Sequence, residues 1–138
     1  MVFKWFRFLH MSKILIIDDE IGICLIMSKF LTKNGYITST AESGATAFAQ
    51  LEKQKFDLVL SDFRLEDTDG REILRKIKSD YPNLPVIIVS GFGDPNLAAE
   101  LINMGAYDFI NKPIYPNVIL DAVKKALEAQ ERINQQNN

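Results

Sequence analysis

Acidic, hydroxyl and lysine side chains recur at the ends of short apolar runs in this sequence of 138 residues. They are Asp18, Asp19 and Glu20 after the first run, Asp62 after the third, Ser90 and Gly91 at the end of the fourth, and Asn111-Lys112-Pro113 after the fifth. Crowded carboxylates repel one another and resist ionisation unless a cation neutralises them. Oxygen ligands with no histidine or cysteine beside them favour Mg²⁺, or Mn²⁺, over zinc. These residue types therefore predict a magnesium site.

The same residues suggest what the bound ion would assist. Asp62 could act as a nucleophile towards phosphorus while the ion neutralises the phosphoryl oxygens. Lys112 would supply a further positive charge, and the Ser90 hydroxyl would donate a hydrogen bond to a phosphoryl oxygen. The pattern indicates a magnesium-dependent phospho-aspartate site.

The runs that carry these residues alternate with amphipathic segments. We expect strands at 13–18, 36–40, 57–61, 86–90 and 108–110. We expect helices at 20–33, 43–54, after Gly70, between Asp94 and Gly105, and from Pro116 to about Arg132. Strands joined by helical crossovers form a mainly parallel sheet in an α/β fold. Ligands of such sheets bind beyond the carboxyl ends of the strands, which is where the candidate residues fall.

Composition excludes several classes of protein. The single cysteine, Cys24, rules out an intramolecular disulfide and a thiolate zinc cluster, and it fits a reducing cytoplasm. The single histidine, His10, lies near the N-terminus, so the domain has no Ser-His-Asp triad or multi-histidine metal site. Sixteen basic residues against 18 acidic ones give no basic footprint for direct nucleic-acid binding. No uncharged apolar run approaches the roughly 20 residues of a membrane span.

The ends of the chain differ from the body, which we expect to be one domain over residues 11–132. The first ten residues read MVFKWFRFLH. Met11-Ser12-Lys13 looks like a natural start, which favours a leader added by cloning or an upstream start codon. The alternative is an aromatic-basic segment that docks on a partner or a membrane surface. The polar residues 133–138 are expected to fray.

Residues 11 to about 132 resemble the receiver domain of two-component response regulators, of the chemotaxis-regulator type. Four motifs carry the resemblance: Ile17-Asp18-Asp19-Glu20, Ser61-Asp62, Val89-Ser90-Gly91 and Asn111-Lys112-Pro113. Each motif is weak alone, but all four occur in order and each falls at an expected strand end. The resemblance implies a flavodoxin-like, doubly wound parallel sheet of five strands in the order 2-1-3-4-5, with five helices.

The resemblance also implies roles for individual residues. Asp62 would be the phosphoacceptor, taking a phosphoryl group from the phosphohistidine of a sensor histidine kinase or phosphotransfer protein. The implied protein ligands of Mg²⁺ are Asp18, Asp19, Asp62 and the backbone carbonyl of Arg64. Ser90 and Lys112 would contact the phosphoryl group, and Lys112-Pro113 would be a cis peptide bond.

Ser90 and Phe109 would form the switch, with Phe109 turning inward when Ser90 is drawn to the phosphoryl group. The chain departs from the family at several positions. Leu65-Glu66 replaces the usual Met-Pro, which leaves the loop conformation open. Phe109 lacks the hydroxyl of the commoner tyrosine, so its switch would work through burial. Arg64 and Phe92 are bulky, and we expect them to shield the aspartyl phosphate from water.

The implied function is a phosphorylation-dependent signalling switch rather than an enzyme in the usual sense, although the domain would assist its own phosphoryl transfer and dephosphorylation. Its output surface would be the fourth helix, fifth strand and fifth helix, which would contact a downstream effector protein or domain, or a second copy in a homodimer. One alternative is a receiver-like binding module that is not phosphorylated. The other is a phosphohydrolase, disfavoured because Arg64 occupies the position where such enzymes carry a general acid.

Simpler structural interpretations exist for some of these residues. Asp19 or Glu20 could cap the helix that follows. Cys24 is expected to be a buried, inert thiol. The acids of Asp67-Thr68-Asp69 are expected to be a solvated loop rather than a second metal site.

Overall fold

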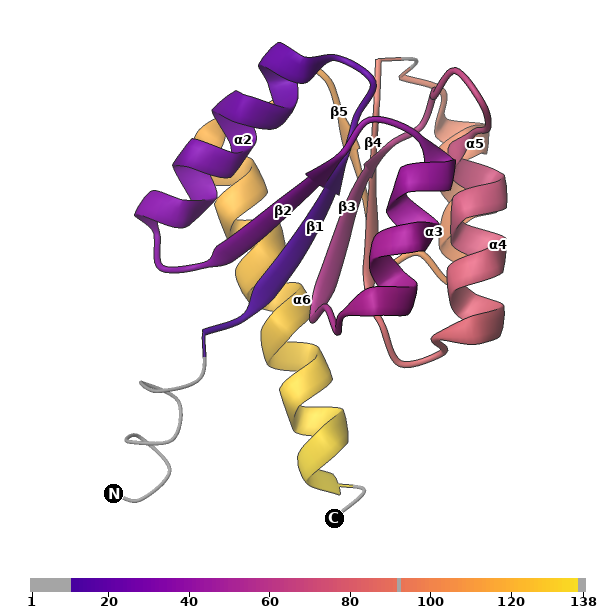
Figure 1. Ribbon diagram of the computed structural model, residues 1–138. Helices are drawn as coiled ribbons and strands as arrows, with labels where there is room; N and C mark the ends of the chain where they lie inside the picture. The colour runs from indigo at the N-terminus through magenta and orange to yellow at the C-terminus, as the bar shows by residue number, and fades with distance from the viewer. Residues whose placement is uncertain (1–10, 92, 137–138) are drawn as a thin grey trace.

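The computed structural model describes residues 11–91 and 93–136, in which strands and helices alternate along the chain (Figure 1). The strands are β1 (Lys13–Ile17), β2 (Ile37–Ala41), β3 (Leu58–Asp62), β4 (Val86–Ser90) and β5 (Asp108–Asn111). The helices are α2 (Ile21–Lys33), α3 (Gly44–Lys53), α4 (Gly70–Asp80), α5 (Pro95–Asn103) and α6 (Pro116–Gln136). Residues 1–10, including His10 and the expected leader, lie outside the described residues, as does Phe92.

The five strands form one parallel sheet in the order β2-β1-β3-β4-β5. The central strands β3 and β4 are buried along their whole length, and each begins with the apolar run expected of a strand covered on both faces. The flavodoxin-like topology expected from the sequence is therefore confirmed. Because every strand runs in the same direction, all five carboxyl ends meet at one edge of the sheet.

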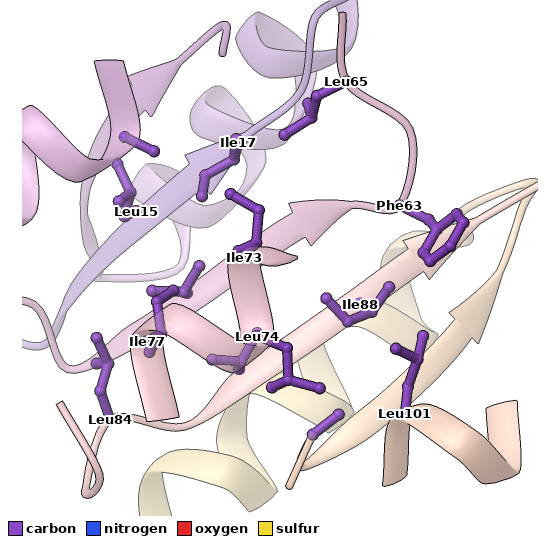
Figure 2. Packing of buried hydrophobic residues seen from close by; sticks show 14 of the residues in the cluster. Leu15, Ile17, Phe63, Leu65, Ile73, Leu74, Ile77, Leu84, Ile88 and Leu101 are labelled. Atoms are coloured by element: carbon purple, nitrogen blue, oxygen red, sulfur yellow. The ribbon is translucent and has the colours of Figure 1, made fainter. Parts of the chain in front are cut away.

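Helices cover both faces of the sheet, so the core has two layers. Helices α3, α4 and α5 lie on one face, and α2 and α6 lie on the other (Figure 1). Successive side chains of β1 alternate between these layers: Leu15 and Ile17 pack under α3–α5, and Ile14 and Ile16 pack under α2 and α6. Figure 2 shows the first layer, in which Ile73, Leu74 and Ile77 of α4 belong to one apolar cluster with Ile88 of β4.

Polar residues fix where the helices begin and end. Ser43 and Thr46 form a capping box at the start of α3, and Asp69 accepts hydrogen bonds from the backbone of the first turn of α4. Asp94 caps α5 with Pro95 at its first position, as expected. Gly35 follows α2 with φ 94°, a left-handed conformation that favours glycine. Among the described residues, no helix combines the length and apolar character of a membrane span.

The last helix extends further than expected. It runs to Gln136 instead of stopping near Arg132. No glycine or proline follows Arg132 to end it, and Gln130 Nε2 donates to Asn134 Oδ1 at 3.2 Å, four residues along the helix. The part of the expected frayed tail that the structure describes is therefore helical.

Two glycines should respond in opposite ways to alanine. A Cβ atom at Gly70 would lie 2.7 Å from Phe63 Cδ2 and 3.3 Å from Phe63 Cα, whereas a Cβ at Gly22 in α2 would meet nothing within 4 Å. We expect Gly70→Ala to lower the free energy of unfolding by about 1–3 kcal/mol through overpacking. We expect Gly22→Ala to raise it by about 0.5–1 kcal/mol through helix propensity. Urea denaturation of both variants measures the difference, and shifts in the same direction would contradict this packing.

Candidate functional site

The predicted site residues follow strand ends at the carboxyl edge of the sheet. Asp18 comes directly after β1, and its N–H donates to Ala41 O at 3.0 Å, which extends the pairing of β1 with β2 by one residue. Asp62 and Ser90 are the last residues of β3 and β4. Lys112 follows β5, and its N–H donates to Ser90 O at 2.8 Å. The backbone of the sheet therefore sets the positions from which these side chains project.

Lys112 joins two of the acids. Its Nζ lies 3.2 Å from Asp62 Oδ1 and 3.9 Å from Asp18 Oδ2. The side chains of Asp18 and Asp62 are 2% and 10% exposed, and that of Lys112 is 25% exposed. Burial opposes the charged form of Lys112, but the combined attraction of Asp62, Asp18 and Glu20 raises its pKa. The lysine is thus a fixed positive charge beside two largely buried carboxylates. The Lys112-Pro113 bond is cis, as the resemblance implied.

Asp62 is held by its own strand end as well as by the lysine. Its Oδ1 accepts a hydrogen bond from the Phe63 N–H at 3.0 Å, so both contacts described for this carboxylate end at Oδ1. Burial raises the pKa of Asp62, and repulsion from Asp19 adds to this, while Lys112 and the Phe63 N–H oppose it. Neither of these two contacts involves Oδ2 of Asp62.

Asp18 is the most deeply buried of the clustered acids. Its Oδ1 accepts a hydrogen bond from the Glu20 N–H at 2.9 Å. Burial raises the pKa of Asp18 from 3.8 to about 6, with repulsion from Asp62 and Asp19 adding to the shift. Glu20 occupies the cap position of α2 but makes no capping hydrogen bond with its side chain. Helix capping by Glu20 therefore does not account for the cluster.

Three carboxylates that could hold a cation follow directly after β1. One oxygen each of Asp18, Asp19 and Glu20 can be chosen so that all three lie within 4.8 Å of one another. This set consists of hard oxygen donors, which suits Mg²⁺. Cys24 Sγ donates to Asp18 O at 3.3 Å, but burial raises the pKa of this thiol to about 11, so it stays protonated and buried, as expected. The donor chemistry fits a magnesium ion, with Glu20 as a neighbour that the resemblance did not assign.

The loop after Asp62 is tied to a second element in a way that the sequence did not reveal. The Asp67 carboxylate accepts hydrogen bonds from the N–H groups of Gly44 at 2.9 Å and Ala45 at 3.0 Å, in the first turn of α3. These bonds lower the pKa of Asp67. The expectation of a merely solvated loop was incomplete: Asp67 is exposed but caps a distant helix, and Asp69 caps α4. An acid before Gly70 and a helical pattern could have indicated Asp69, whereas no local signal indicates Asp67.

The remaining predicted residues occupy different surroundings. Leu65, which replaces the usual methionine, is buried in the core layer under α3–α5 (Figure 2). Arg64 is exposed, and its backbone forms an isolated antiparallel bridge with Asp69. Phe109 in β5 is partly buried against the same core layer, and Ser90 is 1% exposed. The structure thus brings Asp18, Asp62 and Lys112 into contact distance and places Ser90 and Phe109 on the neighbouring strands.

The raised pKa of Asp18 predicts how stability depends on pH without metal. Between about pH 4 and pH 6 the unfolded chain releases this proton and the folded chain retains it, so the contribution of Asp18 to the free energy of unfolding falls as pH rises. We expect Asp18→Asn to stabilise the chelator-treated protein at about pH 8 by on the order of 1 kcal/mol. The gain should disappear at about pH 4. Urea denaturation measures this, with Glu52→Gln on α3 as control; a loss of stability in Asp18→Asn at the higher pH would refute it.

Comparison with known proteins identifies the family of this chain. Residues 14–124 match the family described as the response regulator receiver domain. Sporulation initiation phosphotransferase F of Bacillus subtilis (strain 168) is 38% identical over 116 residues, which cover 84% of this chain and 94% of that protein. Transcriptional regulatory protein GlrR of Escherichia coli (strain K12) is 35% identical over 117 residues, which cover 85% of this chain. They cover 26% of GlrR, so the chain spans about a quarter of that relative.

Solved structures with the same fold include a response regulator receiver domain protein from Clostridium thermocellum, with a TM-score of 0.85 and 29% identity, covering 89% of this chain and 99% of that one. The receiver domain of NtrX from Brucella abortus has a TM-score of 0.79 and 36% identity, covering 83% of this chain and 98% of that one. The family match spans most of the chain, including every clustered acid and Lys112. The chain therefore belongs to the receiver domain family of two-component response regulators.

Proposed function

We propose that this chain is a phosphorylation-dependent signalling switch in which Asp62 accepts a phosphoryl group from the phosphohistidine of a sensor histidine kinase or phosphotransfer protein. The observation that carries the proposal is the contact of Lys112 Nζ with Asp62 Oδ1 at 3.2 Å, beside the buried carboxylate of Asp18. Parallel sheets bind ligands at this edge. Once a cation offsets the carboxylates, the Lys112 ammonium can pair with a phosphoryl oxygen.

Mg²⁺, or Mn²⁺ in its place, would be held by Asp18, Asp19, Asp62 and the backbone carbonyl of Arg64. When bound, the ion supplies positive charge that neutralises the carboxylates and the phosphoryl oxygens. The grouping of Asp18 and Asp19 with Glu20 supports the carboxylate part of this set. Asp19 would contact the ion directly, and Asp18 would contact it directly or through a water molecule.

Asp62 Oδ2 would attack the phosphorus atom, since the described contacts of this carboxylate are both made by Oδ1. A P–O bond forms, the P–N bond of the donor breaks, and the histidine nitrogen keeps the electron pair of that bond. Lys112 would then pair with one phosphoryl oxygen, and the Ser90 hydroxyl would donate a hydrogen bond to another. Asp62 and Ser90 are the last residues of their strands, and Lys112 follows β5, so the sheet backbone sets the positions of all three.

The output would come from the surface formed by α5, β5 and α6. Ser90 drawn towards the phosphoryl group would leave space on the β4–β5 side, and Phe109 would turn inward to fill it. Phe109 is already partly buried, so the change would bury more of a ring rather than form a new polar contact. The altered surface would bind a downstream effector protein or domain, or a second copy of the chain, with no direct contact to nucleic acid.

The domain is regulatory, and chemistry at Asp62 would serve to set and reset the switch. Arg64 lies two residues after Asp62, where a phosphohydrolase of the aspartate-nucleophile class would carry a general acid. Its exposed, bulky side chain, together with Phe92, would slow the attack of water on the aspartyl phosphate. Residues 11–132 would act as the signalling unit, in the cytoplasm.

Phosphorylation should depend on a single carboxylate. We expect acetyl phosphate with Mg²⁺ to add one phosphoryl group to the intact protein, measured by mass spectrometry, and Asp62→Asn to abolish this gain. Asp80→Asn, an exposed acid on α4, is the matched control and should be phosphorylated normally. Unchanged mass of the wild-type protein would instead support a binding module that is not phosphorylated.

Lys112 should compete electrostatically with the metal ion. Removing its charge in Lys112→Met leaves Asp18 and Asp62 without their cation, so we expect Mg²⁺ to bind about threefold to tenfold more tightly. Phosphorylation by acetyl phosphate should nevertheless become slower, because the phosphoryl oxygens lose a partner. Isothermal titration calorimetry and intact mass measure the two effects. Lys125→Met, an exposed lysine paired with Asp121, should change neither; weaker Mg²⁺ binding in Lys112→Met would count against the site.

A further inference from the structure

A groove of about 740 Å³ lies at the opposite end of the molecule from Asp62. Its lining includes Ser12, which precedes β1, and Phe56, which lies shortly before β3. One wall is the second half of α6, whose Leu127 and Glu128 face it. In Figure 1 this part of α6 continues past the amino ends of the strands, so the sheet does not cover it.

The apolar part of the groove belongs to both core layers. Tyr36 and Leu127 pack on the layer under α2 and α6, whereas Phe56 and Leu84 pack on the layer under α3–α5. Tyr36, Phe56 and Leu127 are only partly buried. The two layers therefore both reach the surface in this groove, and an apolar side chain placed here would contact both.

Acidic side chains stand beside these apolar groups. Glu128 and Glu131 on α6 line the groove one helical turn apart, and Asp57 lines it next to β3. Burial raises the pKa of Tyr36, and the charge of Glu128 adds to the shift, which places this glutamate near the phenol. Lys55 and Lys124 are the lysines in the lining. The groove thus offers an apolar floor, and its α6 wall carries Glu128 and Glu131 together with Lys124.

The chain itself supplies a segment with matching chemistry. Ser12 lines the groove, and its carbonyl accepts a hydrogen bond from the Ile37 N–H at 3.0 Å, so the residues before it start at the groove's edge. The ten residues 1–10 have no acid and carry Lys4 and Arg7 among four aromatic residues, Phe3, Trp5, Phe6 and Phe8. Ten residues can reach up to about 35 Å, which is ample for this groove.

We propose that residues 1–10 dock in this groove, with aromatic side chains on the floor formed by Phe56 and Leu127 and with Lys4 and Arg7 towards Glu128 and Glu131. Attachment through Met11 and Ser12 makes docking an intramolecular event. Short flexible linkers give effective concentrations on the order of millimolar, so even weak complementarity populates the docked state. Docking would cover the exposed parts of Phe56 and Leu127 and add contacts to the second half of α6. It would not depend on phosphorylation at Asp62.

Trp5 is the only tryptophan of the chain, so its fluorescence reports on this segment alone. In the full-length protein we expect an emission maximum at shorter wavelength than in a synthetic peptide of residues 1–10. We also expect a Stern–Volmer constant for acrylamide quenching of roughly half the peptide value, because docking shields the indole from water. A Trp5 that is as exposed in the protein as in the peptide would overturn the proposal.

Charge reversal tests where the segment docks. Glu128→Lys with Glu131→Lys should return the quenching constant towards the peptide value, as should Lys4→Glu with Arg7→Glu. Combining all four substitutions should restore most of the protection, because the pairs then carry opposite charges again. Glu52→Lys, an exposed residue on α3, is the matched control and should leave quenching unchanged. Amide NMR spectra of each variant confirm that the domain is folded.

Two further measurements separate the other possible partners of this segment. Protection of Trp5 that is lost on dilution would mean that the segment docks on a second copy. Protection that arises only on addition of vesicles containing anionic lipid would mean that it binds a membrane surface. Either result overturns the proposal, whereas protection that is independent of concentration and of vesicles supports it.

Discussion

The structure depends on one electrostatic constraint: the like charges of Asp18 and Asp62 are buried at one edge of the sheet beside Lys112. Asp18 and Asp62 lose most of their contact with water, and Lys112 Nζ is the cation placed within 4 Å of both. The charge of Lys112 by itself cannot neutralise both of these carboxylates. The burial that raises the pKa of both aspartates is therefore left partly uncompensated, which makes the edge receptive to a further cation.

The fold can sustain this arrangement because the rest of the sheet is so apolar. The strands β1, β3 and β4 are buried between two layers of helices, and the backbone pairing at their ends fixes where each acid begins to project. Helical crossovers keep every strand parallel, so residues some 40 or more positions apart in the sequence meet at one edge. The apolar interiors of the strands form the core, and the polar side chains follow at the carboxyl ends, where sheets of this kind bind ligands.

Much of this could be predicted from the sequence, since the relevant signals are local. Apolar runs ending in Asp62 or Ser90 identify a strand and its functional end together, and the four motifs implied the strand order through a family resemblance. The end of α6 was misplaced because polar residues without glycine or proline are compatible with either a helix or a frayed tail. The bonds from Asp67 to α3 could not be predicted, because they join segments 22 and 23 residues apart through the shape of a loop.

The hydrogen bonds of Asp67 couple the backbone that follows Asp62 to α3 on the outside of the molecule. A single carboxylate holds both the loop after Asp62 and the first turn of α3, and Thr68 fits so tightly over Gly44 that a Cβ there would lie 2.6 Å from its methyl carbon. Any rearrangement of this loop must either carry the start of α3 with it or leave two amide groups without their acceptor. Moving this loop away from α3 would break both hydrogen bonds to Asp67, so the loop is more constrained than an unattached surface loop.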